Sequence, residues 1–321
     1  MKHLFNIQLF SADVTPINVT TQSSMSPTMK TFYDTALLEN ARENMVFTQF
    51  GKKQPMHGNK VEWRKFNTFA KALTPLTEGV IPSGQTFGMT KIEADTTQHG
   101  DFVAVSDRLE LESFDDVIFG ATEEMGATEG ETYDTLTRNI LVAGNSVAYA
   151  GGKNSRATLT KTDILTPEMV NKASTWLKKN KAPKIDGCYV ALIHPSVAED
   201  LRESDSWKEF HKYNDVEPIF KGEIGMLHGV RFIESNECKV WKDGDTAVYA
   251  TLFLGKDAFG ILDPEGEGME MIVKTKDQIG GPLNQFSTIG YKFCHGAKIL
   301  YQERMLRVES GSSYSELDEA N

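Results

Sequence analysis

The sequence predicts an α+β fold with one long amphipathic helix, a set of alternating strands and a smaller α/β region. Residues 188–193 form a short run of apolar and aromatic side chains, which is typical of a strand buried on both faces. Residues 113–150 place apolar side chains at three- and four-residue spacing, which predicts a helix. Residues 60–66 alternate apolar and polar side chains, which predicts a half-buried strand.

The first fifty residues are predicted to form an N-terminal arm. Residues 1–30 mix Ser, Thr, Pro and Met with little periodicity, so they are expected to order only against a partner. Residues 31–50 then show helical spacing. A frayed terminus is the alternative interpretation. Asn6 and Gln8 interrupt the apolar tract near the N-terminus, and we therefore expect no signal peptide.

Residues 51–107 combine strands with a long connecting loop. Strands are predicted at 60–66, 91–95 and 101–107, and the segment between the first two is rich in Pro, Gly and Thr. Long loops inside compact domains are usually functional, and apolar side chains on such a loop need something to cover them. The loop residues of this kind that we single out are Leu73, Leu76, Val80 and Ile81. A hairpin folded onto its own domain is the alternative.

The helix predicted at 113–150 starts at Ser113 and carries a strongly acidic face. From Leu111 to Ala150 there are eight acidic residues and a single basic one, Arg138. Glycines lower helix propensity, so a break is expected around Gly126–Gly130. The linker at 151–156 lacks the spacing of a phosphate-binding loop.

The next region is predicted to be an α/β subdomain. Thr166 with Pro167 begins a helix, because Thr caps the free N–H groups and Pro fits the first helical position. The buried strand ends at His194-Pro195, where a second short helix begins. A further strand is predicted at Val230–Ile233, preceded by glycines that permit tight turns.

The C-terminal third is predicted to be mostly strands. Val240-Trp241 and the run at 247–255 suit a hairpin around Asp243-Gly244. Alternation continues at 269–274 and through 287–308. The last residues, SGSSYSELDEAN, are polar and acidic and are expected to be disordered.

Composition excludes several function classes. The net charge of −11 argues against nucleic-acid binding as the main activity, since phosphate neutralisation needs a basic face. Three widely spaced cysteines, Cys188, Cys238 and Cys294, predict free thiols and neither a zinc site nor a disulfide framework. We predict no metal, no cofactor and no membrane span.

A hydrolase using His194 and Asp200 is one alternative function, although no nucleophile accompanies these two residues at a recognised spacing.

Several motifs resemble one known family. IHP at 193–195, GEIG at 222–225, GVRFIES at 229–235 and TPLTEG at 74–79 resemble the N4-type major capsid proteins of tailed phages, which have the Hong Kong 97-type capsid fold. The resemblance implies an N-terminal arm (1–50), an extended β-loop or E-loop with flanking strands (51–107), the spine helix of a peripheral domain (108–152), an axial domain (153–284), returning strands of the peripheral domain (285–308) and an acidic tail (309–321).

The same resemblance implies a function. It predicts a non-enzymatic major capsid protein that forms the hexamers and pentamers of an icosahedral shell in the virion, assembled in the host bacterial cytoplasm. The partners are then further copies of the chain, with scaffolding, portal and decoration proteins and enclosed double-stranded DNA held without sequence-specific binding. The four loop residues named above become intersubunit contacts. An encapsulin-like nanocompartment shell is a close alternative.

Overall fold

The computed structural model describes residues 45–56, 60–67, 69–81, 83–112, 117–211, 223–243, 246–264, 269–275, 278–279, 285–315 and 318–321. The predicted N-terminal arm and the predicted helix start at Ser113 lie outside these residues. The chain divides into two compact units. Unit 1 has His99–Gly130 and Met269–Phe293 as its described segments, and unit 2 comprises Asn44–Gln98, Glu131–Gly268 and Cys294–Asn321.

The main feature of unit 2 is a seven-stranded sheet with the order β5-β15-β10-β6-β8-β7, in which β9 also pairs with β10. The strands are β5 Val147–Tyr149, β6 Tyr189–Ile193, β7 Glu223–Leu227, β8 Val230–Glu234, β9 Val240–Asp243, β10 Thr246–Leu254 and β15 Met305–Ser310. The predicted strand at 188–193 and the predicted hairpin of β9 and β10 are confirmed.

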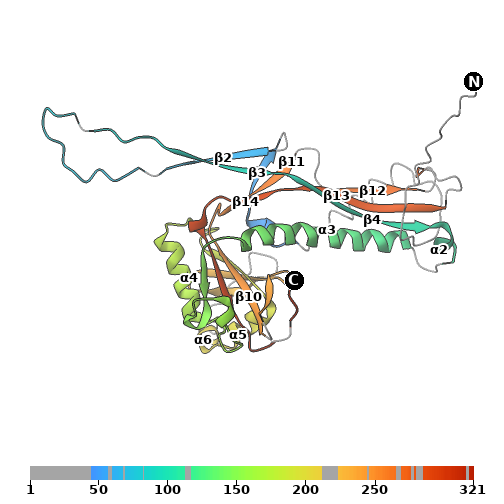
Figure 1. The fold of residues 1–321 in the computed structure, drawn as a ribbon. Helices are drawn as coiled ribbons and strands as arrows, with labels where there is room; N and C mark the ends of the chain where they lie inside the picture. The colour runs from blue at the N-terminus through green and yellow to red at the C-terminus, as the bar shows by residue number, and fades with distance from the viewer. Residues whose placement is uncertain are drawn as a thin grey trace, which may run out of the picture. The chain divides into compact units, whose positions relative to one another are not determined.

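Both faces of this sheet are covered, which explains why β6 reads as a continuous apolar run. Tyr189, Ala191 and Ile193 belong to one hydrophobic cluster, whereas Val190 and Leu192 belong to another. The first cluster includes apolar side chains of α4 Pro167–Lys179, α5 Pro195–Glu203 and α6 Asp205–His211. Figure 1 shows these helices gathered around β10.

Local capping fixes where two of these helices begin. The Thr166 side chain accepts a hydrogen bond from Met169 N at 3.4 Å, and Pro167 occupies the first helical position, as predicted. His194 plays the same part for α5, because its Nδ1 accepts from Ser196 N at 3.3 Å. Between β7 and β8 the chain turns at Gly229, whose φ of 79° favours glycine.

Unit 2 also holds a three-stranded sheet and a two-stranded hairpin. The sheet has the order β1-β11-β14, and the hairpin pairs β2 with β3. The bounds are β1 Lys52–Met56, β2 Lys60–Phe66, β3 Met89–Asp95, β11 Phe259–Pro264 and β14 Ala297–Ile299. Short 3-10 helices occur at Phe47–Phe50, Ala150–Gly152, Arg156–Thr158 and Gln302–Arg304.

Unit 1 contains the three-stranded sheet β12-β13-β4. Its elements are β4 Thr97–Ser106, β12 Glu270–Lys274, β13 Phe286–His295, α2 Asp107–Glu112 and the start of α3 Val117–Val142. Val105, Ile118, Met271 and Ile289 form its hydrophobic cluster. The strands approach closely at Gly100, where an added Cβ would lie 2.6 Å from the Tyr291 carbonyl oxygen.

Three expectations need correction. The long helix α3 is continuous for 26 residues, so the break expected at Gly126–Gly130 is absent. Gly126 and Gly130 are both buried, and their packing outweighs the low helix propensity of glycine. The segment 285–308 is divided, because β13 joins the unit 1 sheet whereas β15 lies between β5 and β10.

The third correction concerns the acidic tail. The described residues after β15 are held by hydrogen bonds. Ser312 Oγ donates to Ser196 O at 2.8 Å, and Tyr249 OH donates to Asp318 Oδ2 at 2.6 Å. Asn321 Oδ1 accepts from Val240 N at 2.9 Å. The prediction of disorder is therefore wrong for these residues, since their polar side chains have partners within the protein.

Candidate functional site

The β2–β3 hairpin has one packed face and one charged face. Along β2, burial alternates with each residue, and Val61 and Trp63 pack with Ala94 and Leu262. On the opposite face Lys60 pairs with Asp95 at 3.0 Å, one of several exposed ion pairs between the two strands. These pairs include Lys91 with Glu62 at 2.8 Å, and Lys91 also contacts Glu93. The pattern fixes the register, because a slip of one residue would expose the apolar face.

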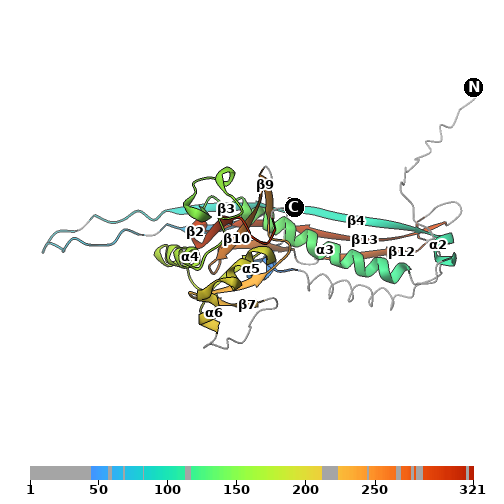
Figure 2. The same cartoon turned by 90° about the horizontal axis from the view of Figure 1, so that it is seen from below.

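Residues 67–88 connect the two strands as a long loop that extends away from the rest of unit 2 in both views (Figures 1 and 2). Its base is closed by Asn67 N donating to Gly88 O at 2.9 Å. Farther along, Gln85 Nε2 donates to Ala70 O at 2.7 Å. Two ring contacts stiffen the base, since the Phe87 centroid lies 5.0 Å from Phe66 and 5.8 Å from Phe69.

The loop presents its apolar side chains to solvent. The predicted contact residues are exposed to a large extent: Leu73 83%, Leu76 77%, Val80 63% and Ile81 93%. Isolated exposed apolar residues are common on protein surfaces, but a concentration of them on one projecting segment marks an interaction surface. The structure thus brings all four residues onto one loop.

Four further apolar side chains are exposed at the loop base and were not among the predicted contacts: Phe66, Phe69, Phe87 and Met89. Phe66 is the last residue of β2 and Met89 the first of β3, and Phe69 and Phe87 lie in the loop close to these strand ends. Their apolar character at this place was a signal that the sequence offered. We name the eight residues together the loop surface.

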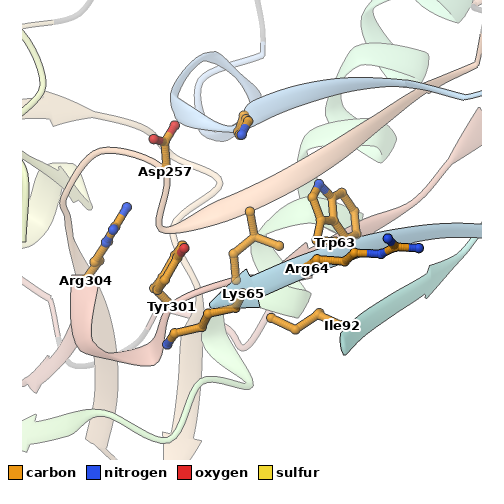
Figure 3. Close-up of a pocket in the computed structure, with 9 residues that line it drawn as sticks. Trp63, Arg64, Lys65, Ile92, Asp257, Tyr301 and Arg304 are labelled. Carbon is orange, nitrogen blue, oxygen red and sulfur yellow. The ribbon is translucent and has the colours of Figure 1, made fainter. Parts of the chain in front are cut away.

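A polar cavity lies at the root of the hairpin (Figure 3). It has a volume of about 200 Å³ and is lined by Lys52, Trp63, Arg64, Lys65, Ile92, Asp257, Leu300, Tyr301 and Arg304. Lys65 Nζ lies 2.8 Å from Glu303 Oε1, and this hydrogen bond is the main cause that lowers the pKa of Glu303. The side chains of Lys65 and Arg304 also lie over the Tyr301 ring, at 4.4 and 3.8 Å from its centroid.

A buried carboxylate anchors the start of the described chain to α3. Asp134 accepts hydrogen bonds from Val46 N at 2.9 Å, from Phe47 N at 3.1 Å and from Thr48 N at 3.1 Å. Burial raises the pKa of Asp134 to about 6, against the lowering effect of these three hydrogen bonds. The segment that follows residue 44 is therefore fixed at one point of unit 2.

The candidate hydrolase residues are engaged in structural contacts. The His194 ring packs against Tyr249 with centroids 4.9 Å apart, and burial lowers its pKa. Asp200 accepts from Ser313 N at 3.1 Å and also from the Ser313 hydroxyl. No hydrogen bond joins His194 to Asp200 in the described chain. His194 thus caps α5, and Asp200 holds the C-terminal tail through Ser313. This arrangement does not resemble a catalytic nucleophile with its general base.

Metal binding and membrane insertion are two further classes of function on which the described residues bear. Within these residues, no three His, Cys, Asp or Glu side chains converge in a way that could hold a metal ion. None of the helices in the described ranges combines the length and apolar character that a membrane span needs.

Comparison with known proteins decides the family. Residues 91–262 match the family model described as phage capsid protein, which is more than half of the 321 residues. The chain belongs to the phage capsid protein family. Among curated proteins, none matches the sequence.

Solved structures agree with the family at the level of the fold. The cyanophage Pam1 capsid protein shares 12% identity, with 97% of this chain and 100% of that chain covered and a TM-score of 0.67. The Ralstonia phage GP4 capsid protein shares 15% identity, with 97% and 98% covered and a TM-score of 0.66. The cyanophage P-SCSP1u capsid protein shares 14% identity, with 84% and 89% covered and a TM-score of 0.63. The predicted α+β capsid fold of the Hong Kong 97 type is confirmed.

Proposed function

We propose that this phage capsid protein is the major shell subunit of an N4-type tailed phage. It forms hexamers and pentamers that close into an icosahedral shell around double-stranded DNA, and it does so without catalysis. Assembly takes place in the host cytoplasm, with scaffolding, portal and decoration proteins as further partners. The family match to phage capsid proteins favours this function over an encapsulin-like nanocompartment.

One observation carries the proposal: a projecting loop exposes Leu73, Leu76, Val80 and Ile81 on a chain of this family. Burial of apolar surface yields about 25 cal/mol per Å², so covering this loop with a neighbouring subunit stabilises assembly without specific chemistry. A loop that extends from a rigid sheet can also adapt to the slightly different environments of hexamers and pentamers.

The remaining parts receive roles on the same basis. We assign the E-loop to the β2–β3 hairpin with residues 67–88, the spine helix to α3, and the axial domain to the seven-stranded sheet with its helices. The unit 1 sheet corresponds to the peripheral domain. The segment before residue 45 serves as the N-terminal arm, and Asp134 anchors its base.

Replacement of residues 72–86 by a short turn tests the proposal. We expect the variant to remain a folded subunit, because every described residue of 72–86 is exposed, but to form no closed shells or rings. Sedimentation velocity and electron microscopy measure assembly, and circular dichroism measures folding.

A matched control keeps the loop and replaces only polar side chains, as in Thr74→Ser, Thr77→Ser and Ser83→Ala. This control should assemble like the wild type. Normal shells from the shortened loop would refute the assigned role, and a wild-type chain that stays monomeric with every candidate partner would refute the proposed function.

A further inference from the structure

The cavity at the hairpin root is unusual in a chain of net charge −11, because cations dominate its lining. Lys52, Arg64, Lys65 and Arg304 contribute positive charge, and Asp257 is the one acidic residue among the nine that line it. Trp63, Ile92, Leu300 and Tyr301 supply an apolar lining beside these charges. Figure 3 shows Arg304, Tyr301 and Lys65 along one side of the cavity, with Trp63 and Ile92 opposite.

Among the described residues, two of the lining cations form no ion pair. Within the described chain, no carboxylate lies at ion-pair distance from Lys52 or Arg304, although Asp257 lines the same cavity. Lys65 and Arg64 are already paired, with Glu303 at 2.8 Å and Glu62 at 3.1 Å. Arg304 is one of the lesser causes that lower the pKa of the neighbouring Glu303, so its charge is partly compensated, and Lys52 carries most of the remaining positive charge of the lining.

Arg304 is also held in position before any ligand arrives. Its Nη1 donates to Lys256 O at 3.1 Å, and its guanidinium lies 3.8 Å from the Tyr301 centroid. A guanidinium has five N–H donors, so several remain for a ligand. Because the side chain is already ordered, binding a carboxylate costs little further conformational entropy.

A complementary surface exists on the same chain. On α3 the exposed acidic residues Glu123, Glu124 and Glu131 form what we name the acidic stripe. Glu124 and Glu131 are seven residues apart, so they lie on one face of the helix about two turns from each other. Arg138 is the sole basic residue of α3, and it is buried and bonded to Glu237 O at 2.8 Å. The stripe therefore has no neutralising cation on its own helix.

We propose that the hairpin-root cavity binds the acidic stripe of α3 from a second copy of this chain. Lys52 and Arg304 pair with its carboxylates, and charge complementarity fixes the register that the non-directional loop surface cannot fix. This inference rests on the proposed function, because it names the partner surface of the same assembling subunit.

Charge reversal in the full-length chain tests the pairing. The cavity variant is Lys52→Glu with Arg304→Glu, the stripe variant is Glu124→Lys with Glu131→Lys, and the fourfold variant combines them. Each twofold variant should lower the assembled fraction at least tenfold in sedimentation velocity at low salt, and the fourfold variant should regain most of it. The matched control, Lys172→Glu with Lys179→Glu, makes the same charge change at exposed positions of α4 and should assemble normally.

Zero-length carbodiimide cross-linking gives a second readout that does not depend on complete shells. In a mixture of isotopically light and heavy protein, we expect mixed-isotope cross-links from Lys52 to Glu123, Glu124 or Glu131. Thermal melting of each variant identifies a loss of folding.

The outcomes distinguish a failure of the cavity–stripe pairing from a failure of the proposed function. Shells that form without these cross-links, or a fourfold variant that stays folded and unassembled, overturn the pairing alone. Cross-links in small oligomers without any shell overturn the proposed function alone. If the cavity variant assembles normally but loses affinity for inorganic phosphate or a short DNA duplex, the site takes phosphate anions and the second-copy proposal is wrong.

Discussion

Strand β6 and the loop at 67–88 are both rich in apolar side chains, yet they have opposite relations to solvent. All five residues of β6 are buried within the subunit, whereas Leu73, Leu76, Val80 and Ile81 of the loop are exposed. Apolar character of a segment is therefore not sufficient to place it in the hydrophobic core of the subunit. In β6 it stabilises the isolated subunit, and in the loop it is available for contact with another molecule.

A matched pair of leucines tests this comparison most strongly. Leu192→Ala in β6 should lower the free energy of unfolding by about 2–5 kcal/mol, because it creates a cavity in a close-packed interior. Leu73→Ala should change it by less than about 0.5 kcal/mol, since the side chain is exposed in the free subunit. Urea denaturation of unassembled protein measures both. Equal losses would mean that the loop packs on its own subunit.

A buried carboxyl group extends the comparison to charge. Glu129 is fully buried, both carboxyl oxygens lack a hydrogen-bond partner in the described chain, and burial raises its pKa to about 8 from the ordinary 4.5. The unfolded chain ionises first as pH rises, so stability should fall between pH 4.5 and 8, by up to about 1.4 kcal/mol per pH unit. Glu129→Gln should remove this fall in the free energy of unfolding between pH 4.5 and 8. Identical profiles of unfolding free energy against pH for both proteins would contradict it.

The anchor at Asp134 should show a smaller effect. Asp134→Ala leaves three buried or half-buried backbone N–H groups without their acceptor, and we expect a loss of about 2 kcal/mol in unfolding free energy. Asp134→Asn keeps one acceptor oxygen and should lose less. Hydrogen exchange at residues 46–48 should accelerate in both variants; unchanged protection there would argue against the anchor.

The smallest effect is expected on the charged face of the hairpin. Lys60 and Asp95 form an exposed pair, and such pairs contribute little to stability. Asp95→Asn should leave the urea midpoint of the subunit unchanged within error, at low and at high salt. A clear shift of that midpoint would show that this face is less accessible to solvent than in the structure.

Local rules were sufficient for part of the fold. A buried apolar run identified β6, proline at the first helical position placed the starts of α4 and α5, and Thr166 was recognisable as the cap of α4, since these signals act over a few residues. The cap that His194 provides for α5 was not predicted. The loop was also recognisable, because Pro, Gly and Thr occur together with apolar side chains that have no periodic pattern.

The remaining features depend on distant parts of the chain. Burial of Gly126 and Gly130 keeps α3 continuous despite propensity, and the tail is ordered because Ser312 and Asp318 bond to residues more than 60 positions away. The hairpin-root cavity combines residues from 52 to 304, so no sequence motif could reveal it.

The place of β15 has a consequence for synthesis. This strand follows every other strand of the seven-stranded sheet in the chain, yet it lies between β5 and β10 rather than at an edge. A ribosome delivers the N-terminal parts first, at about 5–20 residues per second, so the sheet keeps a gap until residues 305–310 emerge. Nascent chains can thus expose their loop while lacking a finished sheet, and the topology delays completion of the subunit until translation has passed β15.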